Sequence, residues 1–315
     1  MATRAHFSYI PTKRDMNVKS LRTGKLTETL HRLAGRDIVK MNGAGNEILV
    51  LDLRGANYAL TPSDARALAA APGLGYDQLM ALGDPQEPGE DAFMTIYNRD
   101  GSLSASCGNG TRCVAHYLAE QTGAATVRLA TSAGRLVVRR DGPLSFTVDM
   151  GRPRLDWREI PLAHAVADTG AVDLGLFGLP PASCVSMGNP HAIFFVAEAE
   201  KFDLATIGPV IEHHPLFPER VNVSLAQVRS IDHARLKVWE RGAGQTLACG
   251  TAACATLVAG VRAGLLRRRA KISLPGGDLV IHWREGDNRV EMTGPVELEF
   301  VAQIDPAIFS DRAAP

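Results

Sequence analysis

The chain has 315 residues and a mass of 33.7 kDa, and 45% of its residues are hydrophobic, which is enough for two ordinary domains with separate cores. Basic and acidic residues number 34 each, so no overall charge attracts nucleic acid or an anionic membrane. The five cysteines are too few for a disulfide framework and indicate a reducing compartment, with the cytoplasm as the expected location. Every apolar stretch falls far short of the roughly 20 residues that a membrane span needs.

Residues 1–35 are basic and contain no continuous apolar run of the kind that a secretory signal requires. We expect a mostly disordered extension there. An organelle transit peptide, a tag and a misassigned start codon remain alternatives, although Asp15 and Glu28 weaken the first of these.

Apolar alternation predicts strands at Asp37–Met41, Glu47–Leu53 and Ala92–Tyr97. Between the last two, Thr61-Pro62-Ser63-Asp64 predicts a helix start, because it supplies a capping threonine, a first-turn proline and an acidic third residue. Gly43-Ala44-Gly45 follows a strand but does not predict a dinucleotide loop, since the third glycine is absent and another strand follows in place of a helix.

The second half of the chain repeats the order of predicted elements in the first. The first copy has a strand ending near Tyr97, a loop, Cys107, a helix to about Glu120, and strands near Val127, Leu136 and Phe146. The second has a strand ending at Trp239, a loop, Cys249, a helix to about Val261, and strands near Ile272, Leu279 and Val290. The two cysteines are 142 residues apart (249 − 107), and the same offset relates the strands. We predict an internal duplication that forms two α+β lobes, with a linker at Gly151–Leu179.

Cys107 and Cys249 each precede a predicted helix, where backbone N–H groups lack helical partners and the helix dipole is positive. The pKa of a free thiol, about 8.5, falls at such positions, which favours the thiolate. Gly108, Gly110 and Gly250 let the backbone approach a ligand, and two facing helix starts would bind one carboxylate from both sides. If one thiolate removes the α-proton of a bound amino acid and the opposite thiol returns one, the α-carbon is inverted.

The other cysteines have simpler interpretations. Cys113, Cys184 and Cys254 fit the role of small buried hydrophobic residues. The same role for Cys107 and Cys249 would leave their equivalent positions in the two copies unexplained. A zinc site is disfavoured because five residues separate Cys107 from Cys113 and four separate Cys249 from Cys254, whereas metal thiolates usually occur as C-x-x-C pairs.

Five sequence blocks, spread from about Ile38 to Phe300, carry a resemblance to a known family. They are Lys40–Asn46, Gly75–Gln78, Asn98–Ser102 leading to Cys107–Arg112, Gly188–His191, and Glu240–Gly244 leading to Ala248–Thr251. On these blocks the chain resembles the diaminopimelate epimerase family.

The resemblance implies an α+β fold of two pseudo-symmetric lobes, each a curved, mainly antiparallel sheet around a central helix, with the active site in the cleft between lobes. The N-terminal lobe would comprise residues 36–151 plus about 295–308, and the C-terminal lobe residues 152–294. The implied activity is the interconversion of LL- and meso-diaminopimelate in lysine and peptidoglycan precursor biosynthesis, without pyridoxal phosphate, another cofactor or a metal. A homodimer is one option for the assembly.

By motif match, Cys107 and Cys249 are the acid–base pair, and His191 and Glu240 tune which sulfur is ionised. Arg241 would bind the distal carboxylate of the substrate, and amide side chains suit an ammonium group beside a carboxylate. The implied substrate site comprises Asn46, Gln78, Asn98, Gly108, Asn109, Asn189, Asn222, Glu240, Arg241, Gly250 and Thr251, with backbone groups at Gly108, Asn109, Gly250 and Thr251 holding the reacting carboxylate.

Structural roles remain as alternatives for several of these residues. His191 would then be a core histidine, Glu240 and Arg241 an exposed ion pair, and Asp100-Gly101 an ordinary turn. The sequence departs from the family pattern at Glu47, Ile48, Gln245 and Ala252, none of which is an expected site residue.

Two rival functions are also open. The nearest is a proline racemase or hydroxyproline epimerase of the same fold, against which the residues for the distal end of the substrate argue. The rival of a different class is a thiol redox sensor or metal-binding module, which predicts reversible oxidation of Cys107 and Cys249, or stoichiometric zinc, without turnover of an amino acid.

Overall fold

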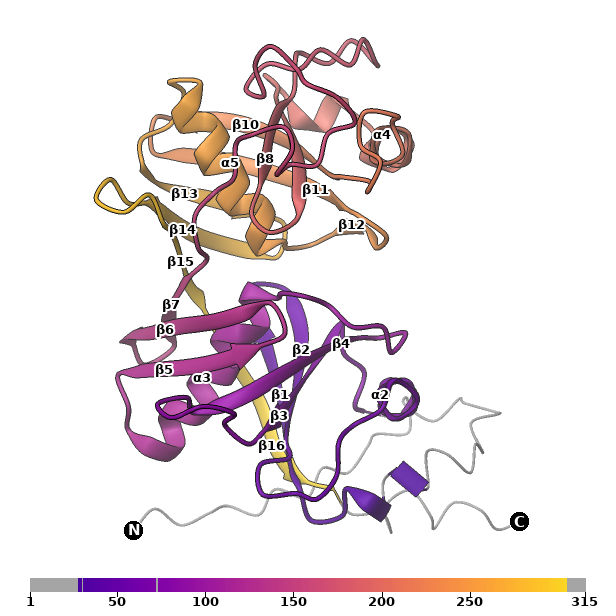
Figure 1. Ribbon diagram of the computed structural model, residues 1–315, viewed down its shortest axis with the longest axis vertical. Coiled ribbons are helices and arrows are strands. Elements are labelled where there is room, and N and C mark those ends of the chain that lie inside the picture. Colours follow the sequence, from indigo (N-terminus) through magenta and orange to yellow (C-terminus); the bar gives the residue numbers. More distant parts are fainter. Residues whose placement is uncertain (1–27, 30, 72, 305–315) are drawn as a thin grey trace. The chain divides into compact units, whose positions relative to one another are not determined.

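The structure, a computed structural model, describes residues 28–29, 31–71 and 73–304, and these divide into two compact units (Figure 1). Unit 1 comprises the described residues up to Leu144 together with those from Val296 onward, and unit 2 comprises Ser145–Pro295. Within the described residues, no helix is both long and apolar enough to span a membrane.

Unit 1 packs one sheet around a buried helix. Its elements are β1 (Asp37–Gly43), β2 (Asn46–Asp52), α2 (Pro62–Ala69), β3 (Gln78–Gly83), β4 (Ala92–Asn98), α3 (Gly108–Thr122), β5 (Thr126–Thr131), β6 (Gly134–Gly142) and β16 (Glu297–Gln303). The strands run in the order β16-β1-β2-β3-β4-β5-β6, with β2/β3 and β4/β5 parallel and the other neighbours antiparallel. Helix α3 lies against β1, β2, β5 and β6 and is buried from Gly108 to Ala119.

Unit 2 has the same plan around a second buried helix, α5. Its elements are β7 (Ser145–Asp149), β8 (Ser183–Ser186), β9 (Pro190–Phe195), η2 (Ala199–Lys201), α4 (Leu204–Glu212), β10 (Asn222–Ser230), β11 (His233–Glu240), β12 (Gly244–Thr246), α5 (Gly250–Arg262), β13 (Arg269–Leu274), β14 (Gly277–Trp283) and β15 (Val290–Pro295). The strand order is β7-β15-β14-β13-β11-β10-β9-β8, and β12 pairs with β11. The pairs β9/β10 and β11/β13 are parallel.

The duplication predicted from Tyr97 onward covers more of each copy than the motifs indicated. The offset of 142 residues carries the start of α2, Pro62, to residue 204, where α4 begins. It likewise relates β1, β2 and β3 to β8, β9 and β10, and the parallel pair β2/β3 corresponds to the parallel pair β9/β10. The predicted α+β fold of two lobes, each a mainly antiparallel sheet around a helix, is therefore confirmed. The exact lobe boundary after residue 151 stays a prediction.

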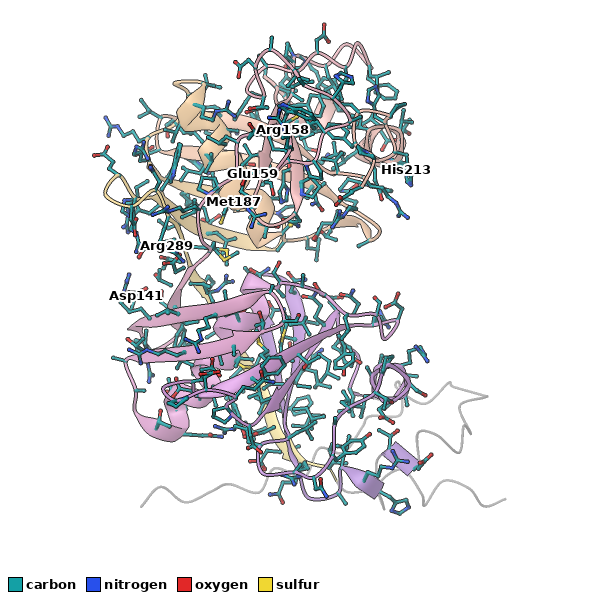
Figure 2. All side chains as sticks on the ribbon, in the orientation of Figure 1. Asp141, Arg158, Glu159, Met187, His213 and Arg289 are labelled. Atoms are coloured by element: carbon teal, nitrogen blue, oxygen red, sulfur yellow. The ribbon has the colours of Figure 1, made fainter. Side chains whose placement is uncertain are left out.

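Two expectations about irregular segments were wrong. The stretch Gly151–Leu179, taken as a linker, lies within unit 2, where Ile160 and Leu162 are buried in the core while Arg158 and Glu159 are exposed (Figure 2). Its apolar residues are spaced too irregularly to show a period, because the segment packs as loop rather than as helix or strand.

The expected extension up to residue 35 also ends earlier than predicted. Leu33 is fully buried in the core of unit 1, and the Thr29 hydroxyl donates a 2.6 Å hydrogen bond to Asp64. Two buried residues in so short a stretch produce no recognisable periodicity. Residues 1–27, which carry the remainder of that expectation, lie outside the described residues.

Helix α2 begins with the capping box that the sequence predicted. The Asp64 backbone N–H donates to Thr61 Oγ1 at 3.2 Å, and the Asp64 carboxylate accepts from the Thr61 N–H at 3.0 Å. Asp64 is fully buried and also accepts from the hydroxyls of Thr29 and Tyr58. A buried carboxylate is tolerated only when such donors replace water, so Asp64 joins the chain before β1 to the start of α2.

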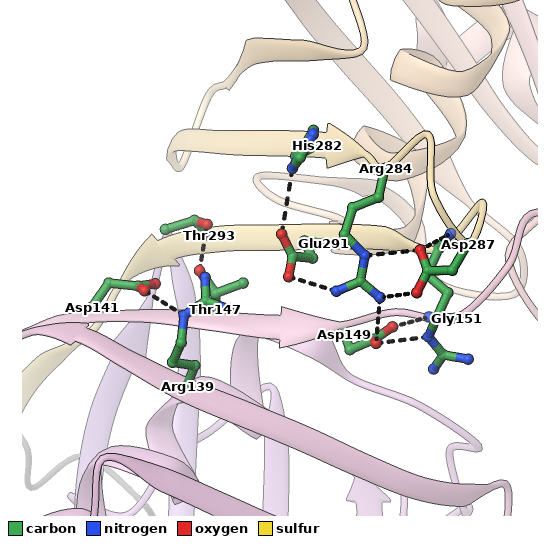
Figure 3. A network of polar contacts seen from close by, with 11 residues as sticks. Arg139, Asp141, Thr147, Asp149, Gly151, His282, Arg284, Asp287, Glu291 and Thr293 are labelled. Carbon is green, nitrogen blue, oxygen red and sulfur yellow. Dashed lines mark hydrogen bonds and ion pairs between the residues drawn. The ribbon is translucent and has the colours of Figure 1, made fainter.

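A second polar network lies at the two ends of the unit 2 chain (Figure 3). Asp149, at the end of β7, accepts hydrogen bonds from Arg289 at 2.7 Å and Arg284 at 3.3 Å. Arg284 also donates to Asp287 at 2.6 Å and to Glu291 at 2.9 Å. Because β7 and β15 are neighbouring antiparallel strands and the first and last strands of unit 2, this network holds the ends of the unit together.

We predict that Asp64→Asn lowers the free energy of unfolding by about 2–4 kcal/mol, because an amide cannot accept all the hydrogen bonds that the buried carboxylate accepts. Urea unfolding followed by circular dichroism measures the change. The matched control is Asp141→Asn, whose carboxylate pairs with Arg139 at the surface and contributes less than about 1 kcal/mol. Equal losses in the two variants would contradict the interpretation.

Candidate active site

Cys107 is the N-cap residue of α3, with the extended backbone angles φ −149° and ψ 98° that a cap requires. Its Sγ accepts a hydrogen bond from the Gly110 backbone N–H at 3.2 Å. A side chain at Gly110 would collide with Met80, and its Cβ would lie 3.3 Å from the Cys107 sulfur. The glycine therefore leaves room for a half-exposed sulfur that lies directly at the positive end of a buried helix.

Amide side chains lie beside this helix start in unit 1. The β1–β2 turn packs directly on it, since a Cβ on Gly43 would lie 2.9 Å from the backbone oxygen of Asn109. Asn109 Nδ2 donates to Asn46 Oδ1 at 2.6 Å across this contact. Unit 1 thus brings together Cys107, Asn109 and Asn46, three of the residues that the sequence assigned to the site.

The other amides expected in unit 1 lie on the neighbouring strands β3 and β4. Gln78 is directly opposite Asn98 in the sheet, and Gln78 Nε2 donates to Asn98 Oδ1 at 3.1 Å. Asn98 Nδ2 donates in turn to Ser102 Oγ at 3.0 Å. Ser102 is itself held by Asp100, which accepts its backbone N–H at 2.8 Å and its hydroxyl at 2.6 Å.

Cys249 is the N-cap residue of α5 in unit 2 and has nearly the same backbone angles as Cys107, φ −139° and ψ 108°. Its surroundings differ. The residue is 6% exposed, and its Sγ lies 3.5 Å from Thr251 Oγ1. Burial, and then the negative charge of Glu240, raise the pKa of the Cys249 thiol well above its ordinary value.

His191 is connected to Cys249 through two polar side chains. His191 Nε2 donates to Asn189 Oδ1 at 2.9 Å, and Asn189 Nδ2 donates to Thr251 Oγ1 at 3.3 Å, next to the Cys249 sulfur. Burial, and then the positive charge of Arg241, lower the pKa of His191 to about 3. The imidazole is therefore neutral near pH 7, and it orients Asn189 and Thr251 without lying in direct hydrogen-bond contact with the thiol.

Glu240 is the last residue of β11 and Arg241 follows it, and the two are held by different partners. The Thr246 hydroxyl donates to Glu240 Oε1 at 2.6 Å. The Arg241 backbone N–H donates to Asn222 Oδ1 at 2.9 Å, and Asn222 Nδ2 donates to the Pro190 carbonyl at 2.8 Å. Asn222 therefore positions the backbone of Arg241, while the exposed guanidinium of Arg241 donates one bond, to the Glu219 carbonyl at 2.9 Å.

Unit 1 thus brings Asn46 and Asn109 to the helix start capped by Cys107, and unit 2 brings Asn189, Thr251 and Glu240 to Cys249. Two side chains that support these residues, Ser102 and Thr246, were not expected from the sequence. Ser102 ends one of the quoted blocks, so its place beside Asn98 could have been suspected. Thr246 lies three residues before Cys249 in a short strand, and no pattern in the sequence distinguishes it.

Several alternative interpretations can now be decided. Asp100-Gly101 forms an ordinary turn, with Gly101 at φ +82°, which agrees with the structural alternative given for this pair. Cys113, Cys184 and Cys254 are fully buried, as predicted, and burial raises the pKa values of Cys113 and Cys184 to about 12.

The departures from the family pattern are accommodated in different ways. Glu47 pairs with the buried Lys40 at 2.8 Å, and Ile48 and Ala252 are fully buried. Gln245 is exposed on β12.

The sequence matches a known family over most of its length. The sequence profile of the diaminopimelate epimerase family matches residues 38–155 and 183–299. A protein named diaminopimelate epimerase from Methylocella silvestris is 57% identical over 291 residues, which cover 90% of this chain and 100% of that protein. Another protein of this name, from Rhodopseudomonas palustris, is 49% identical over 290 residues and has the same coverage.

Solved structures with a similar fold are much less similar in sequence. A predicted epimerase from Pseudomonas aeruginosa superposes with a TM-score of 0.63 at 19% identity, covering 85% of this chain and 98% of that chain. A probable proline racemase from Agrobacterium radiobacter gives a TM-score of 0.60 at 16% identity, covering 86% and 93%. These likenesses concern the fold alone. By the extent and identity of the sequence matches, the chain belongs to the diaminopimelate epimerase family of isomerases.

Proposed function

We propose that the chain interconverts LL- and meso-diaminopimelate, with Cys107 and Cys249 as the two acid–base groups that act on opposite faces of one α-carbon. Family membership supports the substrate, and the observation that carries the mechanism is the pair of thiols, each the N-cap of the buried helix in its own unit. One thiolate removes the α-proton, and the opposite thiol delivers a proton to the other face. Both protons are then carried by the protein's own side chains, so this mechanism requires no cofactor.

The different surroundings of the two sulfurs support a resting state with one thiolate and one thiol. At Cys107 the Gly110 N–H and the positive helix end stabilise a negatively charged sulfur. At Cys249 burial and Glu240 keep the proton on the sulfur. We infer that Cys107 begins the first turnover as the base and Cys249 as the acid, and that the roles exchange for the opposite stereoisomer.

The reacting carboxylate would bind to the free N–H groups at the two helix starts, at Gly108 and Asn109 and at Gly250 and Thr251. These groups have no acceptor within their helices. They would also stabilise the negative charge that develops when the α-proton leaves.

The distal amino-acid end of diaminopimelate would be bound by Arg241 and by the amides of Asn46, Gln78, Asn98 and Asn189. Arg241 is exposed and retains several N–H donors for a two-pronged bond to a carboxylate. Asn222 supports Arg241 through its backbone. Such an enzyme would supply lysine and peptidoglycan precursor synthesis, and we propose the cytoplasm as its location.

We predict that Cys107→Ser and Cys249→Ser each lower the rate of epimerisation roughly a hundredfold or more, because a neutral hydroxyl is a much weaker acid than a thiol and a much weaker base than a thiolate. Incubation with LL-diaminopimelate in heavy water, followed by NMR of the α-position, measures the exchange. Cys113→Ala and Cys254→Ala, which replace buried cysteines on the same two helices, serve as controls and retain activity. Exchange on proline but not on diaminopimelate would support the rival function of a proline racemase. Stoichiometric zinc, or reversible thiol oxidation without any exchange, would support the rival function of a redox sensor or metal-binding module.

We also predict that Glu240→Gln makes Cys249 ionise at lower pH. The negative charge of Glu240 raises the pKa of this thiol, so its removal lowers that pKa and moves the pH profile of alkylation downward. Iodoacetamide labelling of Cys249 at a series of pH values, quantified by peptide mass spectrometry, gives the profile. Glu200→Gln, which removes an exposed carboxylate in the same unit, should leave it unchanged. An unmoved profile in Glu240→Gln would count against Glu240 as the group that keeps Cys249 protonated.

A further inference from the structure

Glu212, the last residue of α4, is a buried acid that the expected site does not include. Its side chain is 4% exposed, and its two carboxylate oxygens accept hydrogen bonds from two different parts of one segment. Oε2 accepts from the indole N–H of Trp239 at 2.7 Å, and Oε1 accepts from the backbone N–H of Gly242 at 2.9 Å. Trp239 and Gly242 are the residues immediately before and after the pair Glu240–Arg241.

We propose that Glu212 is a positioning residue that holds Glu240 and Arg241 in their working geometry by fixing the chain on both sides of them. The inference rests on the proposed function, which assigns Glu240 to Cys249 and Arg241 to the distal carboxylate. Glu212 is not expected to contact the substrate, and its effect passes through the two residues that it flanks.

The packing of Trp239 on α4 supports this role. A Cβ placed on Gly208 would lie 2.5 Å from Cδ2 of the Trp239 ring, so the ring lies directly against the helix at that glycine. Gly208 and Glu212 are four residues apart and therefore lie on the same face of α4. One helix face thus accommodates the ring and accepts its N–H, which fixes Trp239 in both position and rotation.

Gly242 is the second fixed point. Its backbone angle φ is +76°, a conformation that glycine adopts without strain, and the chain turns back there toward β12. The backbone N–H of Gly242 donates to the Glu212 carboxylate, and this bond holds the turn. With both ends held, the side chain of Glu240 stays beside Thr246 and the backbone of Arg241 stays on Asn222.

The first copy lacks this device, and of the pair Glu240–Arg241 it has an arginine at the equivalent position (Arg99, 241 − 142) but no acid. The position equivalent to Glu212 is Ala70 (212 − 142), and the position equivalent to Trp239 is Tyr97. The Tyr97 hydroxyl donates instead to the backbone carbonyl of Leu60 at 2.6 Å. Where the first copy has Asn98, the second has Glu240, and there a buried charge holds the segment.

A carboxylate is needed at position 212 because two N–H donors converge on the side chain, one at each of its oxygens. A carboxylate accepts at both oxygens, whereas the amide of glutamine accepts at one and presents N–H groups at the other. In Glu212→Gln, either Trp239 or Gly242 therefore loses its acceptor and faces a donor. Arg220, whose guanidinium lies 3.7 Å away, supplies an opposite charge at the edge of the site.

The test compares Glu212→Gln with Glu240→Gln in the iodoacetamide assay of Cys249 and in epimerisation of LL-diaminopimelate. We expect Glu212→Gln to move the alkylation profile of Cys249 to lower pH, in the same direction as Glu240→Gln, and to reduce kcat/KM about 10- to 100-fold. It should add little to the effect of Glu240→Gln on the profile when the two changes are combined, because it acts through that residue. The control Glu200→Gln should change neither readout.

The outcomes separate the two proposals. If Glu240→Gln itself fails to move the profile, the proposed role of Glu240 is wrong, and this inference is overturned with it. If Glu240→Gln moves the profile and Glu212→Gln does not, this inference alone is overturned. Should Glu212→Gln not fold, Trp239→Phe takes its place, because it removes the indole N–H and keeps a smaller aromatic ring on Gly208. A shift to lower pH then supports the inference, and an unmoved profile overturns it.

Discussion

Both halves of this protein are organised by the same constraint, namely that a helix surrounded by a sheet must begin with N–H groups that nothing in the helix can satisfy. Helices α3 and α5 are buried over nearly their whole length, so water reaches only their ends. In each unit a cysteine occupies the capping position at that point. The close packing of Gly43 on Asn109 and the absence of a side chain at Gly110 both follow from the need to bring other groups up to this helix start.

The duplication produces two similar scaffolds, and sequence divergence gives them different electrostatics. Cys107 and Cys249 have nearly the same backbone angles, yet one sulfur is half-exposed and accepts a backbone hydrogen bond while the other is buried beside a carboxylate. The position equivalent to Asn98 is Glu240 (98 + 142), and this replacement adds a negative charge beside a sulfur whose pKa is raised first of all by burial. A symmetric scaffold with unequal charges suits a reaction that needs one base and one acid at the same time.

Supporting residues differ between the copies for the same reason. In unit 1 the neutral amide of Gln78 and the hydroxyl of Ser102 hold Asn98, whereas in unit 2 the charged Glu240 lies in a segment held by Thr246, Asn222 and Glu212. A charged group that acts on a neighbouring thiol must be held at a constant distance, since the electrostatic interaction depends on that separation. The additional hydrogen bonds of the second copy are consistent with this requirement.

The sequence by itself determined the elements that depend on local patterns: the capping box at Thr61, the strands around Tyr97 and Trp239, the repeated order of elements, and the two cysteines before helices. These signals are local, because caps and periodicity involve residues close together in the chain. Only the tertiary structure decided that Leu33 and Ile160 belong to the cores, that Asn46 bonds Asn109, and that His191 reaches Cys249 through Asn189 and Thr251. Glu212 is the clearest case: its partners lie about 30 residues further along the chain, and only the packing of α4 on β11 brings them together.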